Sequence, residues 1–88
     1  MIVPWKYNEY FNMDRESQEF TQRMLFLEYL EEAEQEAFHL GEVVSLVEMF
    51  LRDQYMHELN EEYETCQLYK DTFLRFKSEI KDFGWFHK

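Results

Sequence analysis

Large apolar residues recur every three or four positions along most of this chain, which is the spacing of amphipathic helices. The first such segment spans residues 15–40, where Asp14 is a suitable N-cap and Gly41 a suitable C-terminal residue. A helical wheel places one broad apolar stripe on this segment, which we expect to face the core: Phe20, Met24, Leu27, Leu30, Ala33, Ala37 and Phe38. The opposite side, which we expect to face solvent, carries Glu28, Glu32, Glu36 and His39. Glu34 lies near the stripe, and the pattern leaves open whether it is buried.

Residues 42–83 contain neither glycine nor proline, so their division into helices rests on weaker signals. Asn60 is an acceptable cap, and it predicts helices over residues 42–59 and 61–83. The last helix carries a seam with the 3,4 spacing of a heptad repeat: Cys66, Tyr69, Phe73, Phe76, Ile80 and Phe83. One continuous helix over residues 42–83, paired with a second chain, is the alternative. We favour the division, because three helices of similar length bury each other's apolar stripes within one molecule.

These segments predict an all-α fold, a compact three-helix bundle in a single domain of residues 1–88. Two glycines and one proline disfavour an all-β chain, whose turns need both residues. Nine Phe, six Tyr and two Trp supply a dense core for so short a chain. The aromatic arm of residues 1–13 either packs its rings on the bundle or exposes them as a contact patch. Residues 85–88 form a short tail.

Negative charge is concentrated in the middle of the chain. Residues 24–69 hold twelve acidic side chains and a single basic one, Arg52, whereas the whole chain has a net charge of −10. On helices these acids are held at fixed positions, with i,i+4 carboxylates about 6 Å apart, much like successive phosphates of a nucleic acid. The predicted partner-binding acids are Glu28, Glu31, Glu32, Glu36, Glu42, Glu48, Asp53, Glu58, Glu61, Glu62 and Glu64. The plainer interpretation is that the acids keep an aromatic-rich protein in solution.

Several classes of function receive no support from the sequence. Direct binding to nucleic acid or to anionic lipid needs clustered Lys and Arg, which this chain lacks. The lone Cys66 cannot form an internal disulfide, which is typical of a cytoplasmic protein. We find no catalytic signature and no phosphate-binding loop, so we expect neither an enzyme nor a bound cofactor or metal.

The favoured hypothesis is a non-enzymatic acidic binding protein that masks a basic surface on a protein that handles nucleic acid. It would inhibit that partner as a nucleic-acid mimic, and by analogy we expect an origin in a phage or mobile element. The alternative is a helical adaptor or a homo-oligomer, such as a homodimer, that assembles through the aromatic seam.

A metal-carboxylate protein is the remote alternative. Glu36 and His39 form a Glu-x-x-His pair that resembles half of a ferritin-like di-iron site. His57 has no glutamate three residues before it, so the second half of that motif is missing.

Overall fold

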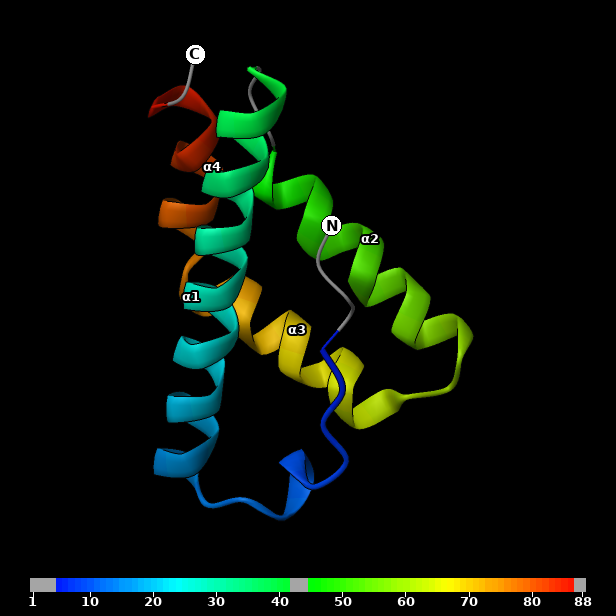
Figure 1. The fold of residues 1–88 in the computed structure, drawn as a ribbon. Coiled ribbons are helices and arrows are strands. Elements are labelled where there is room, and N and C mark those ends of the chain that lie inside the picture. The colour runs from blue at the N-terminus through cyan, green and yellow to red at the C-terminus, as the bar shows by residue number, and fades with distance from the viewer. Residues whose placement is uncertain (1–4, 42–44, 87–88) are drawn as a thin grey trace.

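The computed structural model describes residues 5–41 and 45–86, with side chains described up to residue 81. The fold of these residues is all-α, as the sequence predicts (Figure 1). Its elements are the 3₁₀ turn η1 (Tyr10–Asn12) and the helices α1 (Arg15–Leu40), α2 (Leu46–Leu59), α3 (Tyr63–Arg75) and α4 (Lys77–Phe86). Helix α2 packs on α3 and α4, while α1 packs on α3. The N-terminal arm runs between α1 and α2 in front of α3 (Figure 1).

The predicted bounds of the first helix are confirmed by its two caps. The Asp14 carboxylate accepts a hydrogen bond from the Ser17 backbone N–H at 2.8 Å, and this bond lowers the pKa of Asp14. At the other end, Gly41 has a φ of 68°, and its N–H donates to the Ala37 carbonyl at 2.9 Å. The 26 residues between them give a rigid rod of roughly 39 Å.

The predicted core stripe of α1 is wrong in its rotation about the helix axis. Ala33 is buried and Leu30 packs against the core, but Phe20, Met24, Leu27 and Phe38 are exposed. The stripe that faces the core consists of Thr21, Gln22, Leu25, Phe26, Tyr29 and Ala33. Apolar residues occupy two sides of this helix, so their spacing alone does not predict which side faces the core. The buried side is the one whose tyrosine hydroxyl finds hydrogen-bond partners inside the bundle.

The second half of the chain is divided twice. A turn at residues 60–62 separates α2 from α3, as predicted, with Glu61 in a left-handed conformation (φ 57°). The predicted third helix has a further break at Phe76, which separates α3 from α4. There the Phe76 ring stacks on Phe26 of α1, with centroids 4.4 Å apart and an interplanar angle of 8°. The heptad seam faces inward, with Cys66, Tyr69 and Ile80 buried, and the Phe83 side chain lies outside the described residues.

A chain of buried hydroxyl groups lies at the centre of the bundle. Tyr29 of α1 donates a hydrogen bond to the Asp53 carboxylate of α2, and its oxygen lies 2.6 Å from the Tyr69 hydroxyl of α3. The Trp5 backbone N–H donates to the same Tyr69 hydroxyl at 2.9 Å. Three helices and the N-terminal arm therefore meet at Tyr69. Burial raises the pKa of Tyr69 from its ordinary value of 10.0 to about 12, and burial also raises the pKa of Tyr29.

We expect this network to make the fold sensitive to alkali. The folded chain holds the Tyr69 proton more tightly than the unfolded chain does. The contribution of this group to the free energy of unfolding is therefore fully present below pH 10 and is lost as the pH rises to about 12. A rise of this size in the pKa of Tyr69 corresponds to a loss of about 2–3 kcal/mol. Denaturant unfolding at a series of pH values measures it, and a Tyr69→Phe variant should show a shallower decline. A stability that is flat over this range would contradict the buried network.

Candidate functional site

The predicted acidic residues do not form one continuous belt, and the structure groups six of them in two separate places. One group lines a shallow hollow on α1, formed by Glu28, Glu31, Glu32 and Gln35, which we call the acidic hollow. The other group surrounds the turn between α2 and α3, where Glu61, Glu62 and Glu64 lie beside Asn8 and Phe11 of the arm.

The first group provides the more accessible carboxylates. Glu28 and Glu31 are exposed, and so is Glu34. Glu32 and Glu36 are half-buried, because the core side of α1 lies closer to them than the helical wheel predicts. The exposed side of α1 thus combines Glu28, Glu31 and Glu34 with its unburied apolar residues.

In the second group, around the turn between α2 and α3, Glu62 and Glu64 make contacts within the molecule. Glu62 accepts from His57 Nδ1 at 3.2 Å and pairs with Lys6 Nζ at 3.4 Å, and these contacts lower its pKa, with His57 the larger cause. Glu64 accepts a hydrogen bond from the Phe11 backbone N–H at 2.9 Å. These two carboxylates therefore tie the arm and the turn to the bundle, and they are poor candidates for partner contacts.

The remaining predicted acids have different environments. Asp53 is buried, and its carboxylate accepts hydrogen bonds from the Tyr29 hydroxyl and, at 3.3 Å, from Arg52 Nε. Because a buried carboxylate cannot contact a partner, the assignment of Asp53 to the partner surface is wrong. Glu48 and Glu58 are exposed on α2. Glu42 lies outside the described residues.

The residues of the metal hypothesis do not come together. His39 is exposed on α1, whereas His57 is buried under the turn after α2, against the Tyr69 ring. Within residues 5–41 and 45–81, no group of three or more His, Cys, Asp or Glu is arranged to hold a metal ion.

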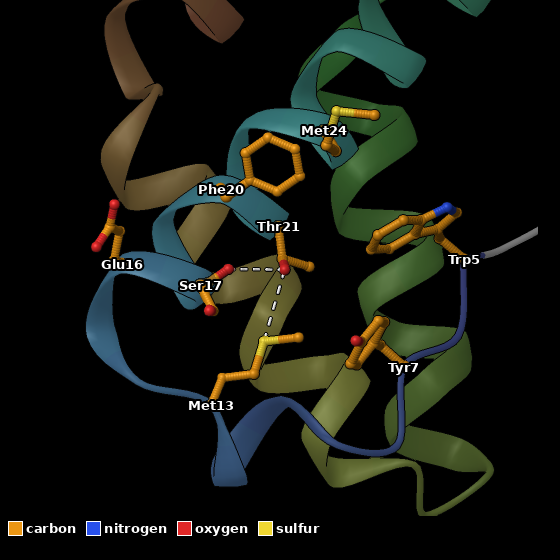
Figure 2. A pocket seen from close by; sticks show the side chains of 8 residues that line it. All are labelled: Trp5, Tyr7, Met13, Glu16, Ser17, Phe20, Thr21 and Met24. Atoms are coloured by element: carbon orange, nitrogen blue, oxygen red, sulfur yellow. Dashed lines mark hydrogen bonds between the residues drawn. The ribbon is translucent and has the colours of Figure 1, made fainter.

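An apolar groove lies between α1 and the N-terminal arm, immediately before the acidic hollow. It has a volume of about 590 Å³ and is lined by Trp5, Tyr7, Met13, Glu16, Ser17, Phe20, Thr21 and Met24. Figure 2 shows Trp5 and Tyr7 of the arm facing Phe20 and Met24 of α1 across it. Phe20 is 65% exposed and Met24 is 41% exposed. Sequence reasoning missed this groove, although the second apolar side of α1 and the aromatic arm are its two walls.

The arm wall of the groove is fixed by hydrogen bonds to α3. The Tyr7 N–H donates to Thr65 Oγ1 at 2.8 Å, and the Thr65 hydroxyl donates to the Tyr7 carbonyl at 3.1 Å. Further along the arm, the Tyr10 hydroxyl donates to Asp71 at 2.6 Å and accepts from Gln22 Nε2 at 2.8 Å. The groove is therefore preformed, since both of its walls are attached to the core.

We expect Thr65→Val to loosen this wall. The substitution removes both hydrogen bonds to Tyr7 and should cost about 1–2 kcal/mol while accelerating amide exchange at Tyr7. Thr72→Val is the matched control, because Thr72 is equally buried on α3 but donates to Leu68 of its own helix. Residue-resolved hydrogen exchange measures the effect. Equal exchange at Tyr7 in both variants would show that Thr65 does not hold the arm.

No protein-family model matches the chain, and neither a curated protein nor a solved structure is detectably similar to it. Within the described residues, no helix is both long enough and apolar enough to cross a membrane.

Proposed function

We propose that this chain is a non-enzymatic binding protein that masks a basic surface of a partner protein through the exposed side of α1. The observation that carries the proposal is the row of exposed carboxylates Glu28, Glu31 and Glu34 on one rigid helix. Lys6, Arg15, Arg52 and Arg75 pair with Glu62, Glu19 and Asp53, and none of these three acids belongs to the row. The negative potential of this side is therefore available to a cationic partner.

The favoured partner is a protein that handles nucleic acid. Carboxylates three or four residues apart on a helix are separated by about 6 Å, and they present fixed charges to a groove built for phosphates. A rigid acidic helix competes with DNA or RNA for such a groove without being a nucleic acid. The chain would thus act as an inhibitor, and association would be fast at low salt.

The test is capture of a partner from the native host, followed by competition. The partner should be displaced from this chain by its own nucleic acid, and the chain should in turn block that nucleic acid from binding. A partner that binds both at once would refute the mimicry.

An assembly role is the second candidate, and a separate observation supports it. Helix α2 exposes Leu51, Tyr55 and Leu59, which lie four residues apart on one side. Such a stripe is typical of a helix that packs against another chain. Sedimentation of the isolated protein distinguishes the two candidates, since a stable oligomer that Leu51→Ser or Leu59→Ser disperses would favour assembly.

A further inference from the structure

We infer that the apolar groove receives one large apolar side chain from a basic helical segment of the partner, whose Lys or Arg residues face the acidic hollow. This inference rests on the proposed function and names the kind of segment that the α1 side binds. The groove and the hollow are consecutive on one helix, because Met24 lines the first, Glu28 lines the second, and i,i+4 residues are neighbours.

The lining of the groove is suited to an anchor side chain. Its volume of about 590 Å³ falls within the range of sites that enclose organic groups. The Trp5 and Tyr7 rings stack with centroids 6.0 Å apart, and they face Phe20 and Met24 across the groove. Tryptophan and tyrosine dominate binding hot spots, and methionine adapts its shape to what it contacts.

Charge complementarity selects a basic occupant. Glu16 is the one charged residue among the eight that line the groove, and three glutamates line the adjoining hollow. Arg23 and Arg75 approach Phe20 in a separate hollow, which they share with Glu16 and Glu19. A second copy of this chain would bring its own net charge of −10, and anionic lipid would likewise be repelled.

The dimensions of the surface suggest the length of the segment. From Phe20 to Gln35 the helix rises by roughly 22 Å, which equals about four turns of a partner helix. The apolar anchor and the basic residues on that helix should be about two turns apart, because Phe20 and Glu28 are separated by eight residues, or roughly 12 Å of helix. This arrangement is a helix laid along a groove, with one anchor at its end.

The experiment uses a fluorescently labelled synthetic Ala/Lys helix of about 15 residues that carries one Phe near its end. Its affinity for the full chain at low salt is compared with that of the same peptide with Phe→Ala. We expect a loss of about tenfold for the Phe→Ala peptide. The Phe20→Ser/Met24→Ser protein should show a similar loss, and on this variant the Phe→Ala change in the peptide should have no further effect.

Leu74→Ser is the matched control, because Leu74 is 70% exposed but lies on α3 outside the groove. The affinity of this variant for the peptide should equal that of the unmodified protein. A Phe→Ala loss that persists in full on the groove variant would overturn the inference. If reversal of Glu28 and Glu31 abolishes binding while the groove variant binds normally, the proposed function survives and this inference fails. A dimer that Phe20→Ser disperses would assign the groove to a second copy and would also overturn it.

Discussion

Replacing Tyr69 by alanine should lower the free energy of unfolding by about 3–5 kcal/mol, which is a large part of the stability of so small a domain. The Tyr69 side chain is fully buried, and its ring contacts Tyr29, Phe50 and His57 at centroid distances of 5.7, 5.9 and 5.0 Å. Its loss leaves a cavity where three helices meet. Denaturant unfolding followed by circular dichroism measures the change.

Two variants separate the contributions of Tyr69. Tyr69→Phe keeps the ring but removes the hydroxyl that accepts from Trp5 and contacts Tyr29, so we expect a smaller loss of about 1–2 kcal/mol. Tyr63→Ala is the control on the same helix, because Tyr63 is 61% exposed, and its loss should stay within about 0.5 kcal/mol. Similar values for Tyr69→Ala and Tyr63→Ala would contradict the described core.

Reversing two carboxylates of the acidic hollow should weaken partner binding by about 100-fold. In Glu28→Lys/Glu31→Lys, two attractive contacts with a basic surface become repulsive ones, and like-charge juxtaposition costs several kcal/mol. Both side chains are exposed, so the helical circular dichroism signal and the stability should change little. Titration calorimetry with the captured partner measures the affinity.

The matched control is Glu9→Lys/Glu79→Lys. Both of these residues are exposed, and each double reversal moves the net charge from −10 to −6, by two units per substitution. The control should therefore bind almost as the unmodified protein does. Equal losses in the two variants would mean that total charge, and no particular surface, governs binding. Loss of folding in Glu28→Lys/Glu31→Lys would mean that these carboxylates serve the core.

Local signals in the sequence predicted the helices well. Asp14 and Gly41 gave both ends of α1, because capping depends only on neighbouring residues. The inward seam of α3 and α4 was also predicted, since one apolar stripe dominates that segment. The break at Phe76 was not predicted, because residues 61–83 contain no glycine or proline to mark it. The contact of the Phe76 ring with Phe26, fifty positions earlier in the chain, is likewise absent from any local pattern.

The candidate site was harder to predict, because it depends on which side of α1 is buried. The helical wheel predicted that the side with Phe20 and Leu27 faces the core, whereas the side with Leu25 and Tyr29 is buried. On the buried side, Tyr29 contacts Phe50 and Asp53 of α2 and Tyr69 of α3, and no local pattern contains these partners. For the same reason the burial of Asp53 was missed, and the groove needs an arm that is held by Thr65 and Tyr69.

The most direct test of the central claim is the affinity of this chain for its captured partner across a salt series from about 50 to 500 mM. If exposed carboxylates of α1 occupy a cationic nucleic-acid site, the affinity should fall steeply with salt, and Glu28→Lys/Glu31→Lys should flatten the slope. An affinity that stays constant over the whole series, with the partner still able to hold its nucleic acid, would contradict the account.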